Sequence, residues 1–299
     1  MASTLRFDPS ELRKYGGLTL VARTLVEGFL TGVHKSPYKG FSVEFAEHRQ
    51  YYPGDEIRHI DWRAYGKTDR YYIKEYEEET NLKAYLLVDA SGSMSYKGKK
   101  GISKFQYAQY VAASLAYLML HQRDSVGLVL HDTKLRKMIP AKASSKHLLR
   151  IIRTLETASP GGETELAPIW HDLAGHQFRR RGMVVILSDC FDDVDRLLRA
   201  LQHFRHKRHE VLLFHILAPE EMDFPFSRLT QFRNLEINGH RLLVDPRRLR
   251  TEYMKNFQEF CAKLRERAGH MRIDYHLLRT DDPVDRALGV YLTRRQRQR

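Results

Sequence analysis

From residue 84 onward, short apolar runs alternate with longer amphipathic segments, and this alternation restricts the fold more than any other feature of the chain. The apolar runs are rich in Val, Ile and Leu, and they lie at residues 84–88, 126–130, 135–139, 183–187, 211–217 and 271–277. The segments between them place apolar residues at helical spacing, at residues 103–121, 145–156, 166–178, 194–204 and 284–292. Strands joined by crossover helices form a parallel sheet with helices on both faces. The sequence therefore predicts an α/β fold with a doubly wound, mainly parallel sheet.

Residues 1–80 have a different pattern. Residues 16–33 have helical character, while residues 41–52 and 69–76 are rich in aromatic and β-branched side chains, as in antiparallel strands. An acidic stretch at residues 77–80 precedes the first core strand. We therefore expect an α+β appendage at residues 1–80 and the α/β domain at residues 81–299.

The composition and the chain ends favour a cytoplasmic protein. No apolar run approaches the roughly 20 residues that a membrane helix requires. The first residues lack the charged, apolar and small-residue zones of a secretory signal. Only two cysteines are present, Cys190 and Cys261, and they suggest neither a disulfide framework nor a thiolate zinc site.

Small polar residues follow the first predicted core strand in the stretch Asp89-Ala-Ser-Gly-Ser93. In open α/β sheets, ligands collect at the carboxyl ends of the strands. Alternation in an extended turn sends the side chains of Asp89, Ser91 and Ser93 the same way. One carboxylate and two hydroxyls form part of an oxygen cage, but a cation of the magnesium type takes six oxygens.

Two later loops supply the remaining oxygens. Thr164 lies in the glycine-rich stretch Gly161-Gly-Glu-Thr164, which leads into a predicted helix. Asp189 ends the predicted strand at residues 183–187 in the same way that Asp89 ends the first one. We therefore expect three loops to converge on one edge of the sheet.

DASGS, GGETEL and LSD, in this order, resemble the metal-ion-dependent adhesion site of von Willebrand factor A domains, whose pattern is DxSxS, then Thr, then Asp. The resemblance implies a fold of von Willebrand factor A type and a divalent cation, Mg²⁺ or else Mn²⁺ or Ca²⁺. It also implies that Ser91, Ser93 and Thr164 bind the metal directly, and that Asp89 and Asp189 act mainly through water. One coordination position then remains for an Asp or Glu of a protein partner. Glu163 departs from the small residue that often precedes the threonine.

A second motif lies in the amino-terminal block, in the segment RQYYPGDEIRHIDW. Its motif residues are Arg49, Tyr51, Gly54, Asp55, Arg58, Asp61 and Trp62. From the residue types alone, the arginines and carboxylates are expected to pair and to seat the appendage on the α/β domain. This segment, followed by DASGSMS, resembles the bacterial family known as domain of unknown function fifty-eight. The resemblance implies a MoxR-type AAA+ ATPase as partner and a chaperone-like role in complex assembly or maturation.

Two other functions remain as alternatives. The net charge of +13, from 50 basic and 37 acidic residues, favours anionic partners and permits nucleic-acid binding, although no recognised reading motif is present. A metal-dependent hydrolase is the other alternative. The chain lacks the GxSxG and GxxxxGK[ST] motifs, so we expect no catalysis of its own.

Overall fold

The computed structural model describes residues 16–34, 48–52, 62–74, 82–99, 101–178, 180–237 and 239–296, together with residues 9, 12 and 60. The chain divides into two compact units, one formed by Met1–Gly32 with Leu82–Arg299 and the other by Val33–Asn81. One boundary between the units lies after residue 81, and a second lies after residue 32.

Helix α1 (Leu18–His34) accounts for the second boundary. The side chains of Val21 and Leu25 are buried. The backbone N–H of Leu18 donates to Oε1 of Glu156 at 2.7 Å. The first turns of α1 therefore pack with the α/β unit, which the sequence pattern did not predict.

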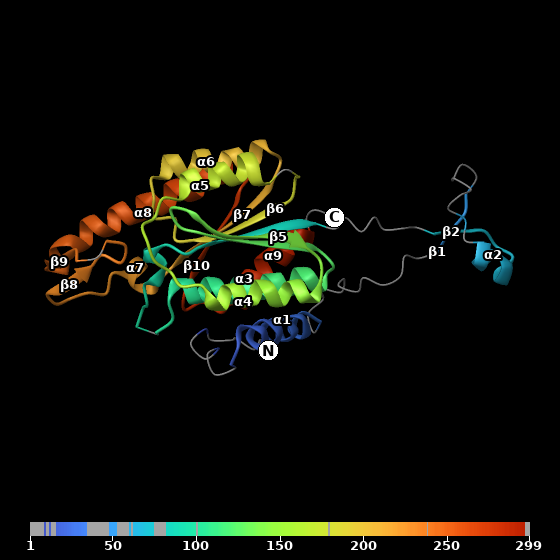
Figure 1. The fold of residues 1–299 in the computed structure, drawn as a ribbon, viewed down its shortest axis with the longest axis horizontal. Helices are drawn as coiled ribbons and strands as arrows, with labels where there is room; N and C mark the ends of the chain where they lie inside the picture. Colours follow the sequence, from blue (N-terminus) through green and yellow to red (C-terminus); the bar gives the residue numbers. More distant parts are fainter. Residues whose placement is uncertain are drawn as a thin grey trace. The chain divides into compact units, whose positions relative to one another are not determined.

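A six-stranded sheet forms the centre of the larger unit, in the order β10-β7-β6-β3-β4-β5 (Figure 1). Its strands are β3 (Lys83–Asp89), β4 (Ser125–His131), β5 (Leu135–Lys142), β6 (Met183–Ser188), β7 (Glu210–Leu217) and β10 (Asp274–Arg279). Strand β5 pairs antiparallel with β4 at one edge, and every other neighbouring pair in this sheet is parallel. This topology confirms the predicted doubly wound, mainly parallel α/β fold.

Helices cover both faces of the sheet (Figure 1). One face carries α5 (Leu166–Asp172), α6 (Val194–His206) and α8 (Pro246–His270). The other face carries α3 (Lys104–His121), α4 (Ser145–Thr157) and α9 (Asp285–Gln296). Shorter elements are a 3₁₀ turn at Gly92–Ser95, a π-helical turn at Leu173–Gln177 and helix α7 (Pro219–Asp223).

Strand β3 is buried on both faces, as expected for a central parallel strand. Tyr85 and Leu87 pack in the layer that contains α5, α6 and α8. Leu86 and Val88, which point to the opposite face, are fully buried as well. Each such side chain contributes about 1.5–3 kcal/mol by leaving water. The strand therefore holds Asp89 at a fixed place on the edge of the sheet.

The described part of the smaller unit contains two short strands and a helix. Strand β1 (His48–Gln50) pairs antiparallel with β2 (Tyr72–Lys74), which confirms the antiparallel pairing expected for this region. Helix α2 (Trp62–Thr68) lies between them in the sequence.

The Asn238-Gly239 pair predicts a two-residue hairpin turn within residues 235–244. A hairpin is present, but its strands end too early for a two-residue turn, and Asn238 itself lies outside the described residues. The strands are β8 (Thr230–Arg233) and β9 (Arg241–Val244), so the connecting loop spans residues 234–240. Asn234 ends β8 because its Oδ1 accepts the backbone N–H groups of Glu236 and Ile237, at 2.8 and 3.0 Å. An asparagine that bonds its own backbone in this way starts a turn before the Asn-Gly signal is reached.

Within the described residues, no helix combines the length and the apolar character that crossing a bilayer requires.

Candidate functional site

The carboxyl ends of β3 and β6 lie beside each other in the middle of the sheet. From β3 the chain proceeds to β4 on one side, whereas β6 leads to β7 on the other side. Ligands of open α/β sheets bind at such a switch point because the loops diverge there. Asp89 is the last residue of β3, and Asp189 directly follows β6. Neighbouring strands therefore deliver the two predicted carboxylates to one place.

The first loop places three of the predicted residues together. The backbone N–H of Ser91 donates to Oδ1 of Asp89 at 2.9 Å. The hydroxyl oxygens of Ser91 and Ser93 are 3.1 Å apart. Neighbouring oxygens around an octahedral Mg²⁺ with bonds of 2.0–2.1 Å are about 3 Å apart. The hydroxyl pair therefore has the separation that two adjacent magnesium ligands require.

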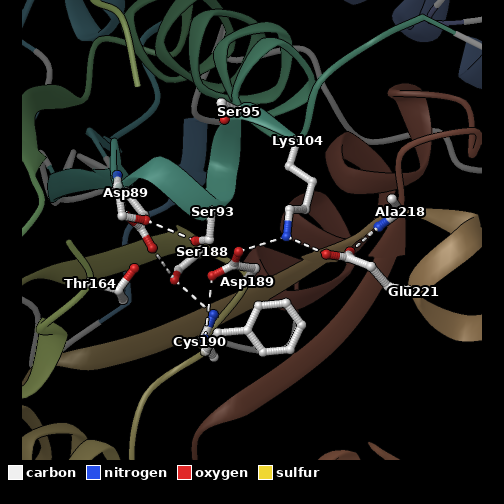
Figure 2. Close-up of polar contacts among 12 residues, drawn as sticks. Asp89, Ser93, Ser95, Lys104, Thr164, Ser188, Asp189, Cys190, Ala218 and Glu221 are labelled. Carbon is white, nitrogen blue, oxygen red and sulfur yellow. Dashed lines mark hydrogen bonds and ion pairs between the residues drawn. The ribbon is translucent and has the colours of Figure 1, made fainter. Parts of the chain in front are cut away.

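The second loop is tied to the first by its backbone. The N–H of Gly161 donates to the carbonyl of Ala90, and the N–H of Gly92 donates to the carbonyl of Gly162, both at 2.9 Å. Figure 2 shows the Thr164 hydroxyl pointing toward the carboxylate of Asp89. The glycines thus bring the predicted threonine to the same edge of the sheet.

The third loop joins Asp189 to Asp89 through a serine that the sequence did not single out. The Ser188 hydroxyl donates to Oδ2 of Asp89 at 2.6 Å, and the backbone N–H of Cys190 donates to the Ser188 oxygen at 2.9 Å (Figure 2). Cys190 has a φ of +56°, which is uncommon for a residue with a side chain. The loop after β6 is thus held in a strained turn beside the two carboxylates.

The electrostatics of the site are dominated by burial. Asp89 and Asp189 are both fully buried. Burial, together with repulsion from the Asp189 carboxylate, raises the pKa of Asp89 to about 7. The site around Asp89 is therefore short of positive charge at neutral pH.

One cation already lies beside Asp189. The ammonium of Lys104 is 2.7 Å from Oδ2 of Asp189 and 2.6 Å from Oε1 of Glu221 (Figure 2). Burial alone lowers the pKa of Lys104, but the attraction of Asp189 and Glu221 outweighs it, so the net pKa is raised. Sequence reasoning missed this pair. The one signal was a lysine in the first turn of a helix, where the helix dipole disfavours a positive charge.

Arg136 and Glu236 were also missed. The Arg136 guanidinium on β5 donates to the carboxylate of Asp132 at 2.6 Å, to the carbonyl of Ser159 at 2.7 Å and to the carbonyl of Gly161. It therefore fixes the glycine-rich loop. Glu236, from the β8–β9 loop, accepts hydrogen bonds from Thr164. The bonds from Arg136 to the glycine-rich loop and from Thr164 to Glu236 have no local sequence signal, because their partners are 23, 25 and 72 residues apart along the chain.

The donor set fits a hard divalent cation. Among the residues that the structure describes, no three His, Cys, Asp or Glu side chains group as a metal site. A cation here therefore depends on hydroxyl oxygens, which Mg²⁺ accepts together with carboxylate and water oxygens. The 3.1 Å hydroxyl pair and the raised pKa of Asp89 are the two observations that favour such an ion.

The amino-terminal motif is described only in part. Gly54, Asp55, Arg58 and Asp61 lie outside the described residues, and Arg49 is described only as part of β1. Within the smaller unit, the Tyr51 and Tyr71 rings lie 6.1 Å apart, and Tyr71 stacks on Tyr65 at 4.5 Å. Trp62 packs edge-on against Tyr65 at 6.2 Å and is 58% exposed. The expected pairing of arginines and carboxylates in this segment stays a prediction.

Gly92 is expected to tolerate no larger residue. A Cβ at this position would lie 2.5 Å from the Leu235 carbonyl oxygen and 2.8 Å from the Gly162 carbonyl oxygen. Both atoms belong to the backbone, so Gly92→Ala is expected to destabilise the α/β unit by about 1–3 kcal/mol. Urea denaturation measures the change. Gly269→Ala is the control, because its Cβ would meet no atom within 4 Å. Equal stability of the two variants would contradict the close packing of the three loops.

The strand order and the polar site at its switch point define a doubly wound α/β protein with a candidate cation site at the carboxyl edge of the sheet. The model of a family described as "Protein of unknown function DUF58" matches residues 47–262. The chain belongs to this family.

Curated relatives include the uncharacterized proteins Rv1480 of Mycobacterium tuberculosis (strain ATCC 25618 / H37Rv) and Mb1516 of Mycobacterium bovis (strain ATCC BAA-935 / AF2122/97). Each is 30% identical to this chain over 223 residues, which are 73% of this chain and 68% of the relative.

The chain is also similar to solved structures at low sequence identity. An aerotolerance-related membrane protein from Bacteroides fragilis NCTC 9343 gives a TM-score of 0.49 at 15% identity, over 71% of this chain and 97% of the other. The conserved hypothetical protein BatB from Bacteroides thetaiotaomicron gives a TM-score of 0.46 at 12% identity, over 70% of this chain and 95% of the other. The VWA domain of SpRpn10 gives a TM-score of 0.39 at 10% identity, over 69% of this chain and 93% of the other.

Proposed function

We propose that this chain is a metal-dependent protein-interaction module. Ser91, Ser93 and Thr164 would hold a divalent cation through their hydroxyl oxygens, and Asp89 and Asp189 would hold its water ligands. The bound cation supplies an open coordination position for a carboxylate of a partner protein. The observation that supports this proposal best is the convergence of the three loops on the two hydroxyls 3.1 Å apart.

The residues of the chain have separate tasks in this proposal. The buried Asp89 supplies a negative charge that lacks a cation of its own, while Lys104 compensates Asp189. Ser188 orients Asp89 by donating to its Oδ2. These contacts fix the carboxylates before an ion arrives, so little ordering remains to be done on binding.

The cysteines do not favour covalent catalysis instead. Burial raises the pKa of the Cys190 thiol well above its usual value and that of Cys261 to about 11. Thiolates are the nucleophilic form of cysteine, and these two thiols stay protonated at neutral pH.

The surface beside the site suits an acidic protein segment that also carries apolar residues. The β8–β9 hairpin exposes the large apolar side chains Leu235, Ile237, Leu242 and Leu243. Arg233 and Arg241 are exposed on the same hairpin and form no ion pair within the described part of the chain. Apolar contact would provide area, the arginines would attract acidic residues, and one acid would reach the cation. The family resemblance makes a MoxR-type AAA+ ATPase the first partner to test.

The test is binding of the full chain to an immobilised MoxR-type ATPase from the same genome, measured by biolayer interferometry. Binding is expected with Mg²⁺ and is expected to fall at least about tenfold with a chelator or with Ser93→Ala, because the ionic contact is lost. Ser145→Ala, at an exposed serine on α4, is the matched control. Binding that survives both treatments would contradict the metal dependence, and absence of binding would contradict the ATPase as partner.

A further inference from the structure

The hairpin loop at residues 234–240 places an acid of this chain at the candidate site. The backbone N–H of Thr164 donates to Oε2 of Glu236 at 3.2 Å, and the Thr164 hydroxyl donates to Oε1 of the same carboxylate. Both oxygens of Glu236 are therefore bound to the residue that contributes the third hydroxyl of the site. Because Glu236 is 72 residues away from Thr164 in the sequence, the fold and not local geometry creates this contact.

We infer that Glu236 is the intramolecular acid of the cation site, so that the β8–β9 hairpin closes the site until an acid of the partner replaces it. This inference depends on the proposed function, because it names the residue that occupies the position left for the partner.

The chemistry of the contact is compatible with a bound cation. A hydroxyl that donates its hydrogen to a carboxylate keeps its lone pairs free for a metal. Carboxylate oxygens are also preferred ligands of Mg²⁺ and Mn²⁺. Glu236 therefore adds the negative charge that a divalent ion needs next to three neutral hydroxyls. Among the predicted site residues, Asp189 already has Lys104 as a counter-ion.

The hairpin loop is built to hold Glu236 in place. Asn234 Oδ1 accepts the backbone N–H of Glu236 at 2.8 Å, and the Asn234 N–H donates to the carbonyl of His240 at 3.0 Å. The loop also packs against the first site loop so closely that a Cβ on Gly92 would lie 3.1 Å from Cα of Glu236. The loop thus covers the small residues between Asp89 and Ser93.

A tethered acid competes strongly with a free one. An intramolecular ligand acts at an effective concentration in the millimolar range, even for a flexible connection. A free carboxylate such as acetate is therefore expected to leave the closed site unaffected. A partner can open it only by adding further contacts, and the exposed apolar and basic side chains of the hairpin provide them.

Calorimetric titration of the full chain with Mn²⁺ tests the inference. Glu236→Gln keeps the shape of the side chain and removes its charge, and it is expected to weaken Mn²⁺ binding by about tenfold or more. Glu252→Gln removes the same charge from an exposed position on α8 and is expected to change the affinity less than about twofold. Circular dichroism checks that both variants are folded.

Acetate rescue distinguishes a metal-binding role of Glu236 from a purely structural role. Added acetate can replace a missing metal ligand, but it cannot replace a missing structural contact. Acetate is expected to strengthen Mn²⁺ binding by Glu236→Ala and to leave the wild type unchanged. Hydrogen exchange of residues 230–244 is expected to slow on addition of Mn²⁺ in the wild type but not in Glu236→Gln.

The outcomes separate this inference from the proposed function. If the wild type binds Mn²⁺, Ser93→Ala abolishes binding and Glu236→Gln binds as the wild type does, the cation site stands and the role of Glu236 is overturned. If the wild type binds no Mn²⁺, the cation site and the role of Glu236 are both overturned. Loss of affinity in Glu236→Gln with acetate rescue of Glu236→Ala supports the inference.

Discussion

Replacing Lys104 by methionine is expected to destabilise the α/β unit by about 3–5 kcal/mol. The Lys104 side chain is 1% exposed, and its ammonium lies 2.7 Å from Asp189 and 2.6 Å from Glu221. Removing it leaves two carboxylates in a buried place without a counter-ion, which costs far more than the ion pair itself contributes. This change is a large fraction of the roughly 5–15 kcal/mol total stability of an ordinary domain.

Urea denaturation at neutral pH measures this effect. Lys99→Met is the control, because Lys99 is exposed, and a change within about 0.5 kcal/mol is expected there. The double variant Lys104→Met/Glu221→Gln is expected to recover part of the loss, since one of the two stranded carboxylates becomes neutral. A Lys104→Met variant as stable as Lys99→Met would contradict the buried pair.

The second large effect is a loss of stability with rising pH in the absence of metal. The folded pKa of Asp89, about 7, lies above its ordinary value of 3.8. The folded state therefore holds more protons than the unfolded state between these pH values, and stability falls as pH rises through that window. At 1.36 kcal/mol per pKa unit, the shift from 3.8 to about 7 makes the contribution of Asp89 about 4 kcal/mol.

Denaturation at a series of pH values from 4 to 8, in the presence of chelator, measures this slope relative to Asp89→Asn. The variant carries no titrating group at this position, so its stability is expected to decline less over the same range. Added Mg²⁺ is expected to restore the wild type at pH 8 and to have little effect on Asp89→Asn. If the unfolding free energies of the two proteins depend on pH in the same way, burial does not raise the pKa of Asp89.

The sheet could be predicted from the sequence because its strands are continuous apolar runs. The run at residues 183–187 became β6, which is buried along its whole length. Parallel strands bring their carboxyl ends to one edge, so the meeting of Asp89 with Asp189 followed from the fold class alone.

The last strand begins three residues later than predicted. Helix α8 continues to His270, and Arg272 then adopts a left-handed conformation with a φ of +55° before β10 starts at Asp274.

The charges that complete the site could not be predicted. Lys104 contacts Asp189 and Glu221 across 85 and 117 residues of sequence, and such contacts leave no periodic signal. Glu236 was hidden for another reason: the Asn-Gly signal placed the hairpin turn at Asn238-Gly239, while Asn234 begins the turn earlier and sets Glu236 inside the loop. The Asx turn at Asn234 would have predicted that Glu236 lies in a loop and not in a strand. It would not have predicted the contact between Glu236 and Thr164.

Equilibrium binding of Mn²⁺ to the full chain, followed by electron paramagnetic resonance, tests the cation site most directly. The site geometry predicts that the wild type binds one Mn²⁺ per chain and that the double variant Ser91→Ala/Ser93→Ala loses this binding while remaining folded. A wild type that binds no Mn²⁺, or a double variant that binds it with unchanged affinity, would contradict the site.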